Sequence, residues 1–475
     1  MSDHLVFVTG KLAEPRLRAV LDGMAPSPFT VEVAQIGVSV AALMTGELIK
    51  RRLPPPPPGA RGILPGRTRC DLAALSDHFG VAFERGPEEL RDLPAYLGGR
   101  AARADLSRHA VTIFAEIVDA PNRSVDNLLE TAERLRRDGA DVIDLGCHPG
   151  ERFEGLETAV AALVAAGHTV SVDSADPEEL LRGAAAGASY MLSLSEDTLW
   201  VLNRTAATPI LIPAKPRDLE SLCRAVDRLR TDGRRFLADP VLDPIHYGFT
   251  DSVVRYHALR RRYADIEILM GIGNLTELTD ADTTGTTALL MGMVSELAIG
   301  AVLTLQVSPH ARTAVREADR ARRIMHAAAE SGSLPKGIDD GLMALRDRRP
   351  FAGTPAEIAE TARSIRDPSF RVEVAEDGVH VYNCDGHHVA TDPYSLYPLL
   401  DLAEDGGHAF YMGVELQKAF LAWQLGKRYV QDEDLSWGCT VEAAERPDDP
   451  ESDAHGFKAA GTTLQERRRA CGKKS

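Results

Sequence analysis

Short apolar runs alternate with longer segments of helical composition through the centre of the chain. The clearest unit is Gly139–Gly146 followed by Thr169–Asp173, two short runs that each carry a carboxylate near the end, with a helix-patterned segment, Phe153–Ala166, between them. Strands joined by a crossover helix pair in parallel. The same alternation predicts eight strands, at Val111–Val118, Val142–Leu145, Val170–Val172, Tyr190–Leu194, Pro209–Ile212, Phe236–Ala238, Ile266–Met270 and Ile299–Leu305.

This pattern predicts an α/β protein with a central (β/α)8 TIM barrel. Eight parallel strands that alternate with helices over about this length are typical of that fold. A doubly wound open sheet is the alternative, since the count of strands by pattern is open to error.

Polar side chains stand at or just past nearly every predicted strand end. They are Glu116, Asp119, Asp144, Asp173, Ser193, Lys215, Asp239, Asn274 and, further on, His310. The carboxyl ends of parallel strands present their side chains to ligands. A cap or loop role explains any one of these residues alone, but a ring of them predicts one pocket on which acids converge.

Three stretches within residues 107–330 carry longer motifs. They are Gly139–Gly146 with Ser171–Asp173, Ala238–Phe249, in which Asp239 precedes a proline, and the turn Gly271–Asn274. Together they resemble the pterin-binding family, which includes dihydropteroate synthase and the methyltetrahydrofolate-binding domains of corrinoid methyltransferases. The chain is most similar to the archaeal-type dihydropteroate synthase-related proteins of tetrahydromethanopterin biosynthesis.

The resemblance implies that a reduced pterin is the substrate or ligand. Carboxylates accept hydrogen bonds from the 2-amino-4-oxo edge of a pterin, and an amide can donate as well as accept. By resemblance, Asp173 and Asp239 bind the pterin and Asp144 is a support or N5-side residue. Asn274 stands where the methyltransferase branch has a pterin-contacting Asn, and Ser193 falls near the family's fourth-strand Asn.

The chain departs from classical dihydropteroate synthases at the first strand. The family's Asn-x-Thr-Pro-Asp-Ser-Phe segment is replaced by Phe114–Asn122, in which Glu116 and Asp119 are secondary candidates for the site.

Positive charge is also missing at two family positions. The seventh-strand Ser-Arg-Lys motif is absent, and Ser308 replaces the eighth-strand Arg that precedes the matching His310. Because a diphosphate leaving group needs positive charge, we expect Lys215 and His310 to be catalytic, with Arg312 as a further candidate. Mg2+ commonly neutralises a diphosphate and is expected with that substrate, but no protein metal site is predicted.

Composition excludes several other classes of function. The chain of 475 residues has 54 Lys and Arg against 70 Asp and Glu, a net charge of −16, which argues against a nucleic-acid partner. No apolar run is long enough to span a membrane, and we read no secretory signal at the N-terminus. The six cysteines form no Cys-x-x-Cys pair, which excludes the usual disulfide and zinc frameworks and favours a cytoplasmic protein.

The chain divides by pattern into four parts. Residues 1–105 read as a small α/β domain, 106–335 as the pterin-binding barrel, and 451–475 as a disordered tail. Residues 350–450 read as an α+β domain that resembles a small domain related to a subunit of tetrahydromethanopterin S-methyltransferase. There we expect a hairpin around Glu376–Gly378 and an amphipathic helix from Tyr411 that runs into a strand before Asp432.

Three functions are open at this point. The resemblance implies a dihydropteroate synthase-like transferase that condenses a dihydropterin diphosphate with a ribofuranosylaminobenzene phosphate, an arylamine phosphate. The alternatives are a pterin-dependent methyltransferase that acts on a corrinoid or a carrier, and a pterin-binding protein without catalysis. We also expect a homodimer, because Ala288–Ala301 is rich in small apolar residues suited to close packing.

Overall fold

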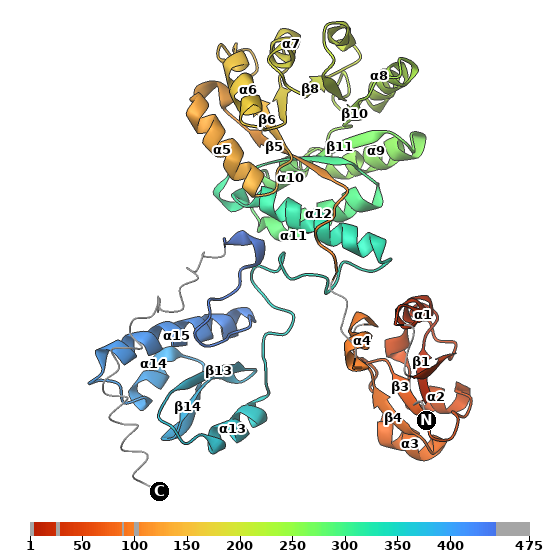
Figure 1. The fold of residues 1–475 in the computed structure, drawn as a ribbon, viewed down its shortest axis with the longest axis vertical. Coiled ribbons are helices and arrows are strands. Elements are labelled where there is room, and N and C mark those ends of the chain that lie inside the picture. Colours follow the sequence, from red (N-terminus) through yellow and green to blue (C-terminus); the bar gives the residue numbers. More distant parts are fainter. Residues whose placement is uncertain (1–3, 25–28, 88–89, 99–103, 443–475) are drawn as a thin grey trace. The chain divides into compact units, whose positions relative to one another are not determined.

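The computed structural model describes residues 4–24, 29–87, 90–98 and 104–442. The predicted tail, 451–475, lies outside the described residues. The chain divides into two compact units, Met1–Ala104 and Asp105–Ser475 (Figure 1).

The first unit is a parallel sheet of four strands in the order β2-β1-β3-β4. Its strands are β1 (His4–Thr9), β2 (Thr30–Gln35), β3 (Arg61–Leu64) and β4 (Ala82–Arg85), and its helices are α1 (Glu14–Asp22), α2 (Gly46–Arg52), α3 (Leu72–Phe79) and α4 (Leu93–Tyr96). Successive residues of β1 belong to two different apolar clusters. Leu5 and Phe7 lie in one cluster, and Val6 and Val8 lie in the other. Since side chains alternate along a strand, both faces of this sheet are covered, as the expected α/β class requires.

The second unit contains a closed barrel in which eight parallel strands follow the order β10-β11-β12-β5-β6-β7-β8-β9. They are β5 (Thr112–Ile117), β6 (Val142–Gly146), β7 (Val170–Asp173), β8 (Tyr190–Leu194), β9 (Thr208–Leu211), β10 (Leu237–Ala238), β11 (Glu267–Gly271) and β12 (Ala301–Leu305). The predicted (β/α)8 barrel is confirmed, and the open sheet is wrong because β12 pairs back onto β5.

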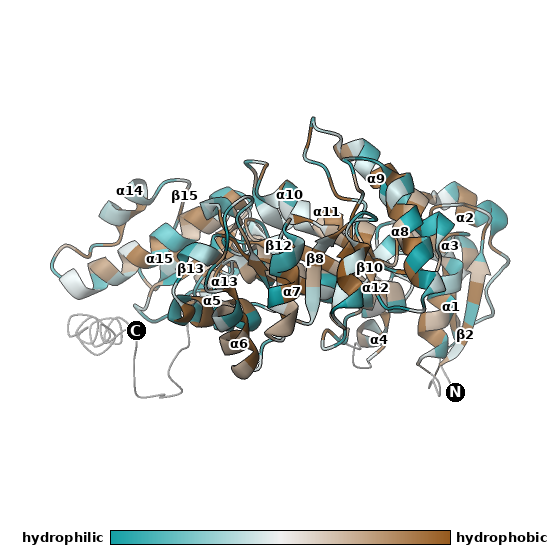
Figure 2. Ribbon diagram, turned by 90° about the horizontal axis from the view of Figure 1, so that it is seen from above, coloured by the Kyte–Doolittle hydropathy of each residue, from teal (hydrophilic) through white to brown (hydrophobic). Residues whose placement is uncertain are grey.

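Helices alternate with these strands around the barrel (Figure 1). They are α5 (Val125–Arg137), α6 (Leu156–Ala165), α7 (Pro177–Ala185), α8 (Leu219–Thr231), α9 (Phe249–Arg262), α10 (Gly273–Thr276), α11 (Thr283–Glu296) and α12 (Ala314–Glu330). Figure 2 shows both hydrophilic and hydrophobic residues along α8 and α9, as expected where one face of a helix packs on the strands. Of the stretch expected at a dimer interface, Leu290, Met291 and Val294 are buried in the barrel core.

A second apolar layer fills the inside of the barrel. Inward residues of the strands, Phe114, Val142, Leu192, Ile210, Leu237, Leu269 and Ala301, form a separate buried cluster. The period of two along each strand then places the next inward residue, two positions on, at the carboxyl end of the barrel. On β5 and β6, and directly after β10, this residue is acidic: Glu116, Asp144 and Asp239.

In the rest of the second unit, the described residues form an antiparallel sheet, β13-β14-β15, with three α-helices. Its elements are α13 (Pro355–Ser364), β13 (Arg371–Ala375), β14 (Gly378–Asn383), β15 (Gly386–Ala390), α14 (Pro393–Leu396) and α15 (Gly406–Leu425). The hairpin around Glu376–Gly378 and the long helix are present. The strand expected after that helix is wrong: Gly426 ends the helix at φ 69°, and residues 427–432 form no strand.

Among the described residues, no helix combines the length and the apolar character needed to cross a bilayer.

Candidate functional site at the carboxyl ends of the barrel strands

Three neighbouring strands bring Glu116, Asp144 and Asp173 together. The register pairs Glu116 of β5 with Asp144 of β6, and Asp144 with Ser171 of β7. Asp173 follows Ser171 by two positions, so both side chains lie on the same face of β7. One carboxylate oxygen from each of the three acids lies within 4.8 Å of those from the other two. The structure therefore unites these three predicted candidates in one acidic cluster.

Gly146 makes room for this cluster. A β-carbon at this position would lie 2.6 Å from Glu116 Oε1, a separation that real β-carbons do not adopt. Any larger residue here must therefore displace the Glu116 carboxylate.

The middle of the cluster has no hydrogen-bond partners within the described residues. Asp144 and Ser171 are both fully buried, and no hydrogen bond reaches either carboxylate oxygen or the Ser171 hydroxyl. Buried polar groups in native proteins nearly always have partners. An orphaned carboxylate beside an orphaned hydroxyl therefore indicates a place prepared for a ligand.

Burial and mutual repulsion disfavour the charged forms of these acids. Burial, followed by the charge of Glu116, raises the pKa of Asp144 to about 7, although the nearby Ser171 hydroxyl opposes the shift. Burial and the surrounding carboxylates raise the pKa of Asp173 well above its usual range. Burial alone raises the pKa of Glu116. Such perturbed groups concentrate at functional sites.

Asp239 follows β10 and is held by one oxygen. The Tyr256 hydroxyl of α9 donates to Oδ1 over 2.5 Å, and the Val241 amide donates to the same oxygen over 2.7 Å. Both bonds therefore leave Oδ2 as the oxygen with which a ligand can pair. Burial raises the pKa of Asp239 to about 6, against the opposing effects of these two donors and of Arg255.

Two polar candidates lie at other strand ends. Asn274 belongs to the short helix α10 after β11, and its Nδ2 donates to the Leu242 carbonyl over 2.7 Å. Its amide oxygen stays available to accept. Ser193 is a half-buried residue of β8.

The basic candidates do not join the acidic cluster. Lys215 and Arg312 are exposed, in the loops after β9 and β12. His310 is half-buried, and its Nε2 contacts the Thr276 carbonyl at 3.0 Å.

Asp119, an acidic candidate, also lies apart from the cluster. It is exposed, has a left-handed backbone at φ 61°, and pairs with His148 Nε2 at 2.6 Å.

Sequence reasoning missed three residues that shape the site. Ser171 was open to detection, because it precedes Asp173 by two positions on the same strand. Gly146 was visible only as the end of a motif. Tyr256 lies on a helix 17 residues beyond Asp239, and nothing in its local pattern distinguishes it from a core aromatic residue.

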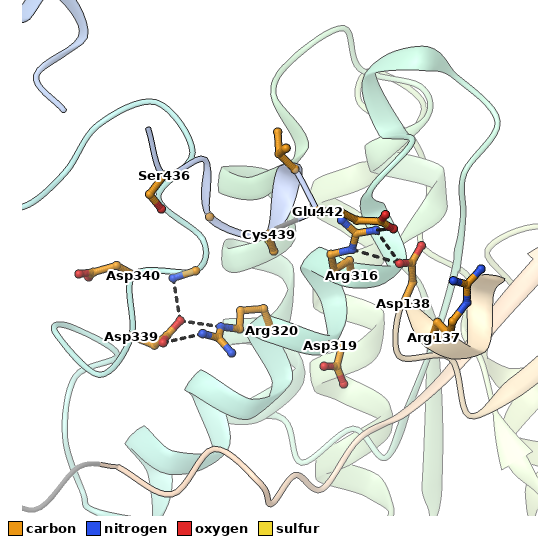
Figure 3. Close-up of a pocket in the computed structure, with 13 residues that line it drawn as sticks. Arg137, Asp138, Arg316, Asp319, Arg320, Asp339, Asp340, Ser436, Cys439 and Glu442 are labelled. Carbon is orange, nitrogen blue, oxygen red and sulfur yellow. Dashed lines mark hydrogen bonds and ion pairs between the residues drawn. The ribbon is translucent and has the colours of Figure 1, made fainter. Parts of the chain in front are cut away.

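An open cleft of about 1050 Å³ lies away from these acids, where the segment ending at Glu442 approaches α12 (Figure 3). Two of its arginines already have carboxylate partners: Arg320 pairs with Asp339, and Arg316 pairs with both Asp138 and Glu442. Because these charges neutralise one another, the cleft is better explained as an ion-pair network that joins two segments.

The family and the relative that match this chain have no described activity. Residues 3–88 match a family of unknown function (DUF6513). The chain is 24% identical over 522 residues to MJ0107, an uncharacterized protein of Methanocaldococcus jannaschii, a match that covers 91% of this chain and 98% of the relative.

Similar solved structures are dihydropteroate synthases. That of Yersinia pestis with a sulfonamide drug complex has a TM-score of 0.38 and 19% identity, over 48% of this chain and 96% of that chain. That of Thermus thermophilus in complex with 6HMPPP has a TM-score of 0.37 and 18% identity, over 47% and 95%. The barrel assignment rests on its own strand topology.

Proposed function

We propose that the barrel binds a reduced pterin between Asp173 and Asp239. The observation that carries this proposal is Asp239 itself, a carboxylate 8% exposed whose two donors both hold Oδ1. A buried acceptor with one oxygen to spare suits a ligand with adjacent N–H donors, such as the 2-amino-4-oxo edge of a pterin. Asp173 supplies a second acceptor, and Asn274 an amide oxygen.

We further propose a dihydropteroate synthase-like condensation in tetrahydromethanopterin biosynthesis. The arylamine nitrogen of a ribofuranosylaminobenzene phosphate forms a bond to the pterin methylene carbon, the carbon–oxygen bond to the diphosphate breaks, and the nitrogen loses a proton. The surrounding carboxylates favour positive charge that develops on the pterin, and fixing the ring beside the amine supplies much of the rate.

The direct test is incubation of the purified protein with the dihydropterin diphosphate and the arylamine phosphate, with the coupled product detected by mass. We expect product with the wild-type protein and none with Asp173→Asn. Pterin binding without product would leave methyl transfer or pterin carriage as the function.

Lys215→Ala tests whether the exposed Lys215, with Arg312 and His310, holds the diphosphate. Lysine is a mobile point charge on a long stem, well suited to phosphate. We expect the substitution to weaken binding of the dihydropterin diphosphate about 2- to 5-fold, as for an exposed charge pair, and to leave binding of the hydroxymethyl pterin unchanged. Calorimetry with both ligands measures the difference, and Arg204→Ala, an arginine paired with Glu178 on the surface, is the control. Equal effects on the two ligands would show that Lys215 does not contact the diphosphate.

The homodimer also stays a prediction. Leu289 of α11 is 67% exposed, although its neighbours Leu290 and Met291 are buried in the core. Light scattering at micromolar concentration should give twice the chain mass, and Leu289→Glu should lower it. A monomeric mass for the wild-type protein would contradict the prediction.

A further inference from the structure

We infer that Glu116, Asp144 and Asp173 form a binding site for a hard divalent cation, Mg2+ or Mn2+. A protein metal site was not predictable from the sequence, because the three acids are far apart along the chain and follow no metal-binding motif. Parallel pairing of β5, β6 and β7 is what brings them together.

The separation of the acids suits such an ion. Ligand oxygens about 2.1 Å from Mg2+ lie about 3.0 or 4.2 Å apart in an octahedron, and the three carboxylates each offer an oxygen within 4.8 Å of the others. An all-oxygen, carboxylate-rich donor set favours Mg2+, Mn2+ or Ca2+ over softer metals. Because 4.8 Å slightly exceeds the larger of these separations, small movements of the side chains would bring the three oxygens to coordination distance.

A second observation, independent of the acids' proximity, points to a ligand here. Ser171 is fully buried, lies in register with Asp144, and shares a strand face with Asp173. Its hydroxyl lies close enough to Asp144 to favour the charged form of that carboxylate, yet it meets the geometry of a hydrogen bond with no group among the described residues. Both oxygens of the fully buried Asp144 are equally unpartnered. A cation beside them would be coordinated by the Asp144 carboxylate. The Ser171 hydroxyl oxygen could also serve as a ligand.

Charge balance favours a cation as the missing partner. Within the described part of the chain, the charged groups that act on these acids are themselves carboxylates: Glu116 acts on Asp144, and Asp144, Glu116 and Asp239 act on Asp173. Burying several like charges without a counter-ion is costly. A divalent ion offsets this cost where no lysine or arginine does.

The cation site extends beyond the proposed function and does not depend on it. One oxygen from each acid suffices for the cluster, and a carboxylate has two, so Asp173 can give one oxygen to the ion and the other to a pterin. When bound, the ion would supply positive charge for a diphosphate at a mouth where Lys215 and Arg312 are exposed.

The test is titration of the full-length, chelator-treated protein with Mn2+, followed by the electron paramagnetic resonance signal of the free ion. We expect one Mn2+ per chain, displaced by Mg2+. Asp144→Asn and Glu116→Gln should each weaken binding at least 10-fold while the proteins stay folded by circular dichroism. Glu151→Gln is the matched control, because Glu151 is an exposed acid in the loop after β6 that contacts only His148 among the described residues, and it should bind Mn2+ like the wild type.

Two outcomes would overturn the inference: no Mn2+ binding at millimolar concentration, or equal affinity in the wild type, Asp144→Asn and Glu116→Gln. Failure of the proposed function can be distinguished from failure of the cation site. Asp239→Asn, which lies outside the cluster, should keep its Mn2+ site whether or not the protein binds pterin.

Discussion

Asp239→Asn is expected to weaken binding of a reduced pterin by about 2–4 kcal/mol, roughly 30- to 1000-fold in Kd. The asparagine oxygen can take the place of Oδ1 and accept from Tyr256 and Val241, so the side chain keeps its position. An NH2 group then replaces Oδ2. This donor would face the N–H donors of the pterin edge, which lose their acceptor and stay buried without a partner.

Isothermal calorimetry with a reduced hydroxymethyl pterin measures this loss without any need for turnover. Tyr256→Phe keeps the carboxylate and removes one of its two anchors, so we expect a smaller loss of about 3- to 10-fold. Asp251→Asn, an exposed acid on the same helix α9, is the matched control and should bind like the wild type. An affinity of Asp239→Asn within twofold of the wild type would remove Asp239 from the pterin site.

The barrel was predictable from the sequence because each strand is a short apolar run that is buried on both faces. The runs at Val142–Leu145 and Tyr190–Leu194 coincide with β6 and β8 to within one residue. The strand expected before Asp432 failed for the opposite reason. Its residues contact the helix that precedes them and pair with no neighbouring strand among the described residues. Tyr429, for example, donates a hydrogen bond to the buried Glu415 of α15.

The site was predictable only as far as strand ends define it. The position of a polar residue at or just past the end of an apolar run is a local pattern, and it placed Glu116, Asp144 and Asp173 at one end of the barrel. The same pattern does not predict where the side chain of a loop residue lies. Asp119 lies only two residues beyond the end of β5, but its left-handed backbone directs the chain elsewhere and its carboxylate pairs with His148.

Asp239→Asn is also expected to stabilise the fold at neutral and alkaline pH. The folded-state pKa of Asp239 is raised from 3.8 to about 6, chiefly by burial, so the folded protein binds this proton more tightly than the unfolded chain. Stability contributed by a raised carboxyl pKa is present below the unfolded value and is lost as pH rises through the folded value. The wild type should therefore lose stability between about pH 4 and pH 6, by about 3 kcal/mol for a shift of about two pKa units.

The asparagine variant carries no charge at this position and should not show that loss. Urea unfolding at several pH values should give a free energy of unfolding that exceeds that of the wild type by about 3 kcal/mol at pH 8, and by about 1 kcal/mol or less near pH 4.5. Loss of the Asp239 charge also relieves its repulsion of Asp173, which adds to the gain. Asp251→Asn should show no such pH-dependent gain. A variant less stable than the wild type at pH 8 would mean that the Asp239 carboxylate is satisfied within the fold and is not held for a ligand. A gain in stability together with a loss of pterin binding would show that the barrel sacrifices stability at Asp239 in order to bind.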